Sequence, residues 1–297
     1  MSEKAPPKLL FPPRRDDRRP GCFRAEGLVI QASGRAALLA PAVAPLRAAG
    51  IGLSLIPGDG RSARGGQPSR GLIDRATAAW VRLLADAPQE SYPQAFCMVN
   101  DESGIILRSG GPAGLLYALL FLAETWDGGL EAGTVADWPE IPNRCVLLDI
   151  SRARVPRLSF LREFVDLIAS LRFNQLTFNL EHVLLPPGMD PMEDEVITTA
   201  ELAALNSHCR DRGVEYIPFQ QSLGHLRGIL SRPENRGLAY NPAQPWSLDP
   251  GNEASYELLG RLYDQQLAVT GSPLFHAGCD EPFDMIRSFD PARFGGR

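Results

Sequence analysis

The chain of 297 residues lacks most of the features that would assign it to a specialised class of protein. Its five cysteines are scattered and form no Cys-x-x-Cys pair, which argues against a disulfide framework and a zinc knuckle. No apolar run approaches the roughly 18 residues that cross a bilayer, and the N-terminus has no apolar secretory core. Lys and Arg number 30 against 35 Asp and Glu, so the basic surplus of a nucleic-acid-binding protein is missing. These absences favour a cytoplasmic protein that binds neither membranes nor nucleic acid.

The composition that remains is that of a soluble globular protein, with 44% hydrophobic and 22% charged residues. The length suits either two ordinary domains or one large α/β barrel. Residues 1–20 are rich in Pro and Arg and are expected to form a flexible arm. Residues 21–138 predict a small α+β domain, and residues 139–297 predict a β/α domain. The segment Asp137–Pro142 is predicted to be the linker because it contains two prolines, Pro139 and Pro142.

The first of these domains mixes strands and helices without a regular order. Its predicted strands are Gly27–Ile30, Ile51–Ile56, Phe96–Val99 and Gly104–Arg108. Its predicted helices are Arg35–Ala49, Ala76–Ala87 and Gly114–Trp126, and Gly58–Gly71 is predicted to be a solvated loop.

The second domain alternates strands and helices regularly. The predicted strands are Cys145–Ile150, Gln175–Leu180, Val214–Pro218 and Pro273–Gly278. The predicted helices are Leu158–Leu171, Thr198–Arg212 and Glu253–Val269, with Thr198 and Thr199 as candidate N-caps. Apolar strands joined by helices indicate a parallel sheet buried on both faces. Both a doubly wound sheet and a TIM (β/α)₈ barrel fit that pattern.

Polar residues at the ends of the strands favour the barrel. Each predicted strand is followed at its C-terminal end by acidic, amide or imidazole side chains, the place where barrel enzymes build their active sites. These residues are Asp149, then Asn179, Glu181 and His182, then Gln220, Gln221 and His225, and finally Asp280 and Glu281.

Adjacent carboxylates at Asp280 and Glu281 are the sharpest chemical signal. One carboxylate favours protonation of its neighbour, and a general acid needs that proton. Taken alone, the pair fits a cap on the following helix better than it fits a catalytic role. A metal site of His182, His225 and His276 is disfavoured because the spacing matches no metal motif. The apolar positions Phe160, Phe164, Leu167 and Leu171 are expected to form the core-facing side of their helix.

Four motifs occur along the chain in a fixed order, and their order and spacing make the set specific. They are NRCVLLDISRARVP from Asn143, FNQLTFNLEH from Phe173, SLGH from Ser222 and HAGCDE from His276. The set resembles glycoside hydrolase family 20, the β-N-acetylhexosaminidases, whose motifs run Arg-Gly-x-x-x-Asp-x-x-Arg, Lys-x-Asn with His-x-x-Asp, Gly-His and Gly-x-Asp-Glu. The family carries a small α+β domain ahead of its barrel, so the resemblance spans nearly the whole chain beyond the arm.

By this resemblance Glu281 is the general acid that protonates the glycosidic oxygen. Asp280 orients the 2-acetamido group of the substrate, whose carbonyl oxygen is the nucleophile, so the reaction retains configuration without an enzyme nucleophile. Arg144 binds sugar hydroxyls, and His225 is the histidine of the pocket. No metal or organic cofactor is implied, and the partner is an amino-sugar-containing glycan.

Several positions depart from the family pattern and indicate a divergent branch. Cys145 replaces a glycine, Arg172 replaces a lysine, and the second-strand aspartate is missing. Glu181 or His182 is a candidate for the lost polar role, with an ordinary strand-end residue as the alternative. Gln220 and Gln221 stand where an acidic residue is frequent. Trp246 is a candidate to stack on a sugar face.

The predicted function is hydrolysis of terminal β-linked N-acetylglucosamine or N-acetylgalactosamine. The alternatives are an inactive sugar-binding or structural remnant and a different hydrolase on the same barrel. The stretch after Ile141 is shorter than the roughly 250 residues of a closed barrel. We therefore expect a truncated chain with the first four βα units only, which associates with itself through open barrel edges.

Overall fold

The structure is a computed structural model, and it divides the chain into two compact units. The first comprises Met1–Arg144 with Asp166–Arg172 and Asp211–Gly213, and the second comprises Cys145–Val165, Phe173–Arg210 and Val214–Arg297. The residues described are 13–16, 19–23, 28–31, 46, 53–56, 70–102, 104–126, 129–152, 155–186, 188–189, 196–288 and 290–294.

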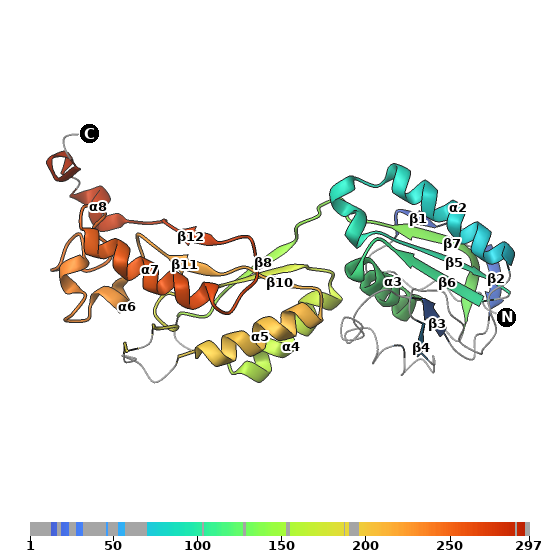
Figure 1. Cartoon of the computed structure of the whole chain (residues 1–297), viewed down its shortest axis with the longest axis horizontal. Coiled ribbons are helices and arrows are strands. Elements are labelled where there is room, and N and C mark those ends of the chain that lie inside the picture. Colours follow the sequence, from blue (N-terminus) through green and yellow to red (C-terminus); the bar gives the residue numbers. More distant parts are fainter. Residues whose placement is uncertain are drawn as a thin grey trace, which may run out of the picture. The chain divides into compact units, whose positions relative to one another are not determined.

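An antiparallel sheet organises the first unit (Figure 1). Its strands are β1 (Arg15–Asp16), β2 (Arg19–Phe23), β5 (Phe96–Asp101), β6 (Gly104–Ser109) and β7 (Leu130–Asp137). Strand β7 pairs with β1, β2 and β5, and β5 pairs in turn with β6. A separate parallel pair joins β3 (Leu28–Gln31) to β4 (Leu53–Ile56).

Two helices cover opposite faces of this sheet (Figure 1). Alternate residues of β5 pack against one helix or the other, because successive side chains of a strand point to opposite faces of the sheet. Phe96 and Met98 pack in the cluster of helix α3 (Pro112–Thr125). Cys97 and Val99 pack instead with helix α2 (Arg70–Asp86). The 3₁₀ helix η2 (Gln89–Gln94) leads from α2 into β5.

Strands β1 and β2 place residues 15–16 and 19–20 in the sheet, so the flexible arm predicted for residues 1–20 is wrong at these positions. The sequence also does not predict strand β7. Its sequence LEAGTVAD contains alanine, glycine and acidic residues, which have low strand propensity. Pairing on both sides within the sheet overrides that local preference. Helix α2 also begins at Arg70, earlier than predicted. The helix predicted at Arg35–Ala49 lies, apart from Leu46, outside the described residues, as does most of the predicted loop Gly58–Gly71.

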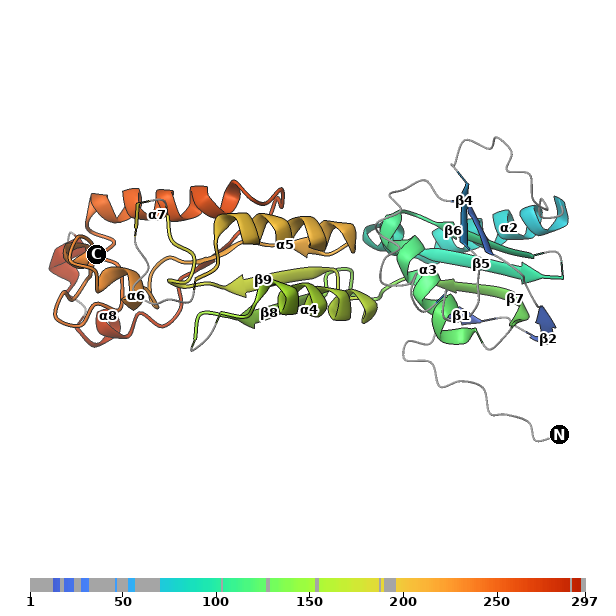
Figure 2. The ribbon, with the colours of Figure 1, turned by 90° about the horizontal axis from the view of Figure 1, so that it is seen from below.

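The second unit holds parallel strands that follow one another in chain order (Figure 2). They are β8 (Cys145–Asp149), β9 (Gln175–Asn179), β10 (Glu215–Tyr216), β11 (Phe219–Gln221) and β12 (His276–Gly278). Strand β9 pairs with β8 and β10, and β11 pairs with β12. Pro218 separates β10 from β11 because proline has no N–H for the ladder. The third predicted strand, Val214–Pro218, is therefore only the short β10, and β11 follows it as a separate strand that the sequence does not predict.

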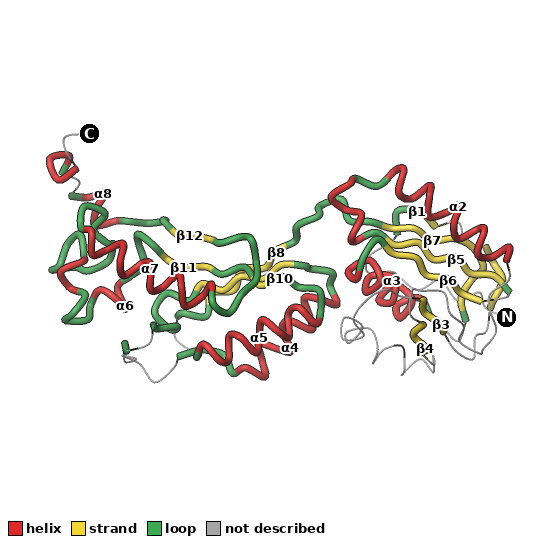
Figure 3. The backbone as a smooth tube through the Cα atoms, in the orientation of Figure 1, coloured by secondary structure: helices red, strands yellow, loops and turns green. Residues whose placement is uncertain are grey.

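Helices lie between most of these strands, although none separates β10 from β11 (Figure 3). They are α4 (Leu158–Ser170), α5 (Thr199–Asp211), α6 (Arg227–Leu230), α7 (Glu253–Leu267) and α8 (Phe283–Arg287), with 3₁₀ helices η3 (Arg236–Leu238) and η4 (Pro291–Phe294). Thr198 caps α5 as predicted: its Oγ1 accepts from the Glu201 N–H at 3.1 Å, and Glu201 Oε2 accepts from the Thr198 N–H at 2.9 Å. No helix among the described residues is long and apolar enough to span a membrane.

The apolar face predicted for α4 is only partly buried. Phe160 and Leu167 are 52% and 54% exposed, which corrects their assignment to the core, and Phe164 and Leu171 are half-buried. Leu147 of strand β8 is also 53% exposed. The four predicted apolar positions of α4 therefore do not all face the core: two of them face solvent and two are half-buried.

Candidate active site

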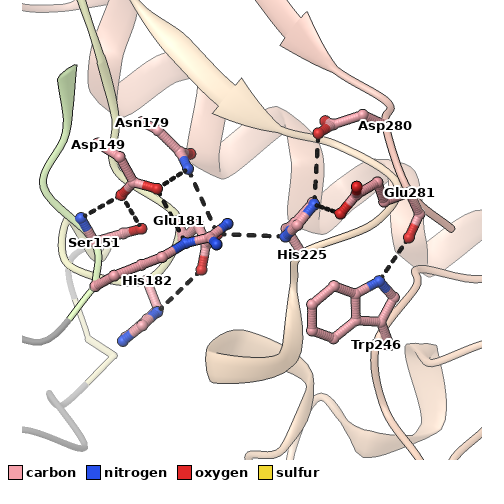
Figure 4. Close-up of polar contacts among 10 residues, drawn as sticks. Asp149, Ser151, Asn179, Glu181, His182, His225, Trp246, Asp280 and Glu281 are labelled. Atoms are coloured by element: carbon pink, nitrogen blue, oxygen red, sulfur yellow. Dashed lines mark hydrogen bonds and ion pairs between the residues drawn. The ribbon is translucent and has the colours of Figure 1, made fainter. Parts of the chain in front are cut away.

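Polar side chains from the ends of four strands meet in one cluster of the second unit (Figure 4). Strand β8 leads into the first group, β9 into the second, β11 into the loop of His225, and β12 into the carboxylate pair. The members are Asp149, Ser151, Arg152, Asn179, Glu181, His182, His225, Trp246, Asp280 and Glu281. Parallel strands bring their C-terminal ends to one edge, which is why residues so distant in sequence come together.

His225 is the centre of the cluster. Its side chain is only 5% exposed, and carboxylates face both ring nitrogens. Nδ1 lies 3.5 Å from Glu181 Oε1, while Nε2 lies 3.1 Å from Glu281 Oε2 and 3.5 Å from Asp280 Oδ2. An imidazole between carboxylates is fixed in orientation and able to stabilise charge on either side. The geometry thus links Glu181 to the carboxylate pair through one buried ring.

Asp280 and Glu281 face His225 rather than the following helix. Helix α8 has Pro282 at its N-cap position and no side-chain capping hydrogen bond. The two carboxylates are 58% and 53% exposed, so a ligand has direct access to them. The alternative of a helix cap is therefore wrong for these side chains, and the pair is free to act on a bound molecule.

Backbone strain concentrates in this cluster. Glu181, His225 and Glu281 adopt positive φ angles of 39°, 59° and 49°. Non-glycine residues in the left-handed region cost of order 1–3 kcal/mol each and persist only where the surroundings hold them. These three residues form the chain of contacts through His225, and Arg172 of the first unit, with a φ of 62°, is the other described non-glycine residue in this region.

A glycine in the SLGH motif permits the close approach of two loops. A Cβ on Gly224 would overlap with the Asp280 carbonyl oxygen and would lie 2.9 Å from that of Glu281. Behind this loop, Ile229 and Leu230 pack in an apolar cluster with Leu258 of α7. Gly224 therefore lets the His225 loop contact the carboxylate loop, and the apolar cluster supports it.

Asp149 is held in its charged form at the edge of the cluster. Burial raises the pKa of this carboxyl, but the hydrogen bonds from Ser151 and Asn179 and the charge of Arg152 outweigh that effect and lower the pKa overall. Ser151 donates from its N–H at 2.9 Å and from Oγ at 2.7 Å, and Asn179 Nδ2 donates at 3.2 Å. Asp149 thus anchors the side chains around it.

Arg152 is a member of the site that the sequence interpretation missed. Its Nε lies 3.0 Å from Asp149 Oδ2, and Nη2 lies 3.3 Å from Glu181 Oε1. The side chain is 64% exposed, so part of the guanidinium faces solvent. The signal was present: Arg152 is the arginine that closes the Asp-x-x-Arg segment of the first motif.

Arg144 does not join this cluster. Its guanidinium donates to the backbone oxygens of Arg172 at 2.7 Å, Ile141 at 2.7 Å and Pro142 at 3.1 Å. It also donates to Gln94 Oε1 at 2.8 Å and Tyr117 Oη at 2.7 Å, all within the first unit. The sugar-binding role implied for Arg144 is therefore corrected: its donors are used to hold the backbone.

The other predicted residues lie as follows. Glu181, rather than His182, takes the position facing His225, and His182 Nδ1 lies 3.9 Å from Glu181 Oε2. The Trp246 ring packs 4.8 Å from His225, and its Nε1 donates to the Glu281 carbonyl at 2.7 Å. Gln220 and Gln221 are buried in the interior, where Gln220 Oε1 accepts from Gln266.

Comparison with known proteins gives relatives over part of the chain. No model of a protein family matches it. The chain is 28% identical to a β-hexosaminidase of Akkermansia muciniphila over 190 residues, which cover 55% of this chain and 38% of that protein. It is 29% identical to human hexosaminidase D over 151 residues, which cover 47% of this chain and 29% of that protein. The aligned stretches thus span less than half the length of these relatives.

Solved structures share the fold over nearly the whole chain. The N-acetyl-β-hexosaminidase of Streptomyces plicatus matches with a TM-score of 0.70 at 17% identity, covering 96% of this chain and 60% of that one. The family 20 enzyme of Streptomyces coelicolor gives 0.71 at 16% identity, covering 96% and 61%. The Flavobacterium johnsoniae chitobiase gives 0.73 at 16% identity, covering 95% and 46%.

The fold is therefore that of the α/β, TIM-barrel type hexosaminidases. The curated matches add a sequence similarity to β-hexosaminidases over part of the chain, in agreement with the resemblance of its motifs.

Proposed function

We propose that the cluster around His225 is the active site of a β-N-acetylhexosaminidase that removes terminal β-linked N-acetylglucosamine or N-acetylgalactosamine. The observation that carries the proposal is the contact of buried His225 with the exposed pair, 3.1 Å from Glu281 and 3.5 Å from Asp280. A general acid and an orienting carboxylate on adjacent residues are what a substrate-assisted reaction needs.

In the first step the acetamide carbonyl oxygen of the substrate attacks C1, and the bond from C1 to the glycosidic oxygen breaks. Glu281 donates its proton to the departing oxygen, while Asp280 accepts the amide N–H and stabilises the positive oxazolinium. In the second step water attacks C1 from the face opposite the acetamide oxygen, the bond between C1 and that oxygen breaks to restore the acetamide, and the Glu281 carboxylate takes the proton of the water. Configuration at C1 is retained, and Glu281 ends protonated as it began.

His225 and Glu181 are positioning residues in this reaction. His225 contacts Glu181 through Nδ1 and Glu281 through Nε2, so the buried ring holds the Glu281 carboxylate in place beside the scissile bond. Arg152 lies 3.3 Å from Glu181 and keeps part of its guanidinium exposed, so it is our candidate for contacts with sugar hydroxyls. We propose Trp246 as the ring that lies against the sugar.

The test compares substrates that differ only at the 2-position. We expect an aryl β-N-acetylglucosaminide to be hydrolysed with retention of configuration. NMR detection of the first-formed anomer of the product measures this. The corresponding trifluoroacetamide should react far more slowly, because its carbonyl oxygen is a weaker nucleophile. Equal rates for the two substrates would contradict substrate assistance, and hydrolysis of the plain glucoside alone would favour a different hydrolase.

A second candidate is a sugar-binding or structural remnant without turnover. It is favoured by the exposure of Asp280 and Glu281, since an enclosed, dry site strengthens the interactions that catalysis uses. Binding of N-acetylglucosamine with no hydrolysis of the aryl glycoside would support it.

We further propose that residues 139–297 supply four βα units of a half-barrel behind a small α+β domain of residues 21–138. Strand β8 lies at the edge of its sheet, and the apolar side chains of Leu147 on β8 and Phe160 on α4 are exposed, which supports an open edge. Because exposed apolar edges associate, we expect the 297-residue chain to form dimers or larger species in sedimentation velocity. A monomer at micromolar concentration would contradict the open edge.

A further inference from the structure

A cavity of about 740 Å³ lies beside the candidate active site, within the second unit. Trp246 lines it together with Phe283 of α8 and the loop after α6. None of the reaction steps above uses this space.

The lining of the cavity is strongly basic. Arg227, Arg236 and Arg287 all contribute to it, and all three are exposed. Within the described part of the chain, no hydrogen bond or ion pair joins their guanidinium groups to another residue. The cavity thus gathers three unpaired arginines although the formal net charge of the chain is −5.

The acidic residue in the lining does not neutralise them. Asp284 is buried, and its carboxylate accepts hydrogen bonds from Ser247 Oγ, from the Ser247 N–H at 3.1 Å and from the Met285 N–H at 3.0 Å. These neighbouring donors therefore already satisfy the Asp284 carboxylate. The cavity keeps a positive surplus of about two charges, and an anion within it would meet several guanidinium donors.

The position of the cavity relates it to the leaving group. Trp246 belongs both to the cavity and to the cluster, because its Nε1 donates to the Glu281 carbonyl at 2.7 Å. Phe283 follows Glu281 closely in sequence and also lines the cavity. A general acid stands on the side of the scissile bond from which the leaving group departs. The part of the substrate beyond Glu281 is therefore the part that reaches the arginines.

We propose that this cavity binds an anionic substituent, a sulfate ester or a uronic carboxylate, on the sugar that leaves. The proposal rests on the hexosaminidase function proposed above and deepens it, since it assigns the chain to acidic glycans. Both anions match the planar donor fork of arginine.

The experiment measures binding without turnover, in the 297-residue chain carrying Glu281→Gln. Three disaccharides with a non-reducing β-N-acetylglucosamine are titrated by calorimetry: one with a neutral second sugar, one with a 6-sulfated sugar and one with a uronic acid. We expect one anionic ligand to bind about tenfold more tightly than the neutral one. The anion that gains more identifies the substituent, and the gain should shrink as salt rises.

Charge-removing variants locate the effect. Arg236→Gln combined with Arg287→Gln should abolish the preference for the anionic ligand. Arg261→Gln is the matched control, since Arg261 is an exposed arginine of helix α7 outside the cavity, and it should leave the preference unchanged.

Equal affinity for neutral and anionic disaccharides overturns the proposal and leaves the hexosaminidase assignment standing. So does an equal loss of preference in the Arg261 control. Arginine-dependent binding of inorganic sulfate, with no binding of any of the three disaccharides, overturns the leaving-group assignment together with the proposed function.

Discussion

Two polar networks of this chain, each built around an arginine of the same motif, have opposite characters. Around Arg144 in the first unit, each donor meets an oxygen, and the partners Tyr117 and Arg172 are buried. Burial raises the pKa of Tyr117, although the charges of Arg144 and Arg172 lower it in part. Around Arg152 in the second unit, the guanidinium is itself 64% exposed, and Glu181 links it through His225 to Asp280 and Glu281, which are more than half exposed.

The two networks therefore differ in their partners: the donors of Arg144 hold backbone and side-chain oxygens of the first unit, whereas part of the Arg152 guanidinium faces solvent. Arg144 is only partly buried, but each of its donors already has an acceptor, so a ligand would offer it no new hydrogen bond. An exposed arginine beside strained carboxylates has donors left for a substrate. Residue type and motif do not distinguish the two arginines, and only their partners do.

The largest effect is expected from the carboxylate that the second network presents. Glu281→Gln should lower kcat/KM for an unactivated disaccharide by about 10²–10⁴-fold, because the variant has no proton to give to the leaving group. An aryl glycoside with a good leaving group should lose less. The matched control is Glu257→Gln on the exposed face of α7, which should keep full activity. Similar activity in both variants would remove Glu281 from the reaction.

The contact between the His225 loop and the carboxylate loop is the next most sensitive feature. Gly224→Ala inserts a Cβ where the Asp280 carbonyl oxygen lies, so one loop must shift. A displacement of about 1 Å in a reacting group costs roughly 10²-fold in rate. Gly237→Ala is the control, since its added Cβ meets nothing within 4 Å. Comparing kcat and thermal unfolding of the two variants shows whether the loss is catalytic; unchanged kcat in the Gly224 variant would count against the contact.

Exchanging each arginine for lysine tests the comparison of the networks directly. Arg144→Lys should lower the free energy of unfolding by about 1–3 kcal/mol, because buried acceptors lose their donors. Arg152→Lys should change stability much less and weaken binding of an N-acetylglucosamine-type inhibitor. Urea unfolding measures the free energy of unfolding of each variant, and inhibitor titration measures the affinity of each variant for the inhibitor. The reverse pattern would restore Arg144 as the sugar-binding residue.

The smallest effect concerns the pH dependence of stability. The pKa of Asp149 is lowered in the folded state, so this carboxylate stabilises the fold above its ordinary pKa and ceases to do so as pH falls through the folded pKa. Asp149→Asn should therefore lose stability at neutral pH and show a weaker decline on acidification. Thermal unfolding from pH 7 to pH 3 measures this, and parallel curves for both proteins would exclude a contribution from Asp149.

Local patterns were enough for most of the second unit. The strands β8, β9 and β12, the helices α4, α5 and α7 and the capping box at Thr198 follow from hydrophobic periodicity and capping residues, which act over a few neighbouring positions. The order of four motifs also indicated the family relationship and the cluster at the strand ends. These features depend on the chain's own residue types and spacing.

Tertiary structure decided the rest, because it depends on partners distant in sequence. Strand β7 has weak local propensity and exists because β1, β2 and β5 pair with it. The positive φ angles of Glu181, His225 and Glu281 are held by surroundings that no local pattern encodes. Whether an arginine binds sugar or backbone depends on which oxygens the fold brings within 3 Å of it, and for Arg144 those oxygens come from residues as far away as Gln94, Tyr117 and Arg172.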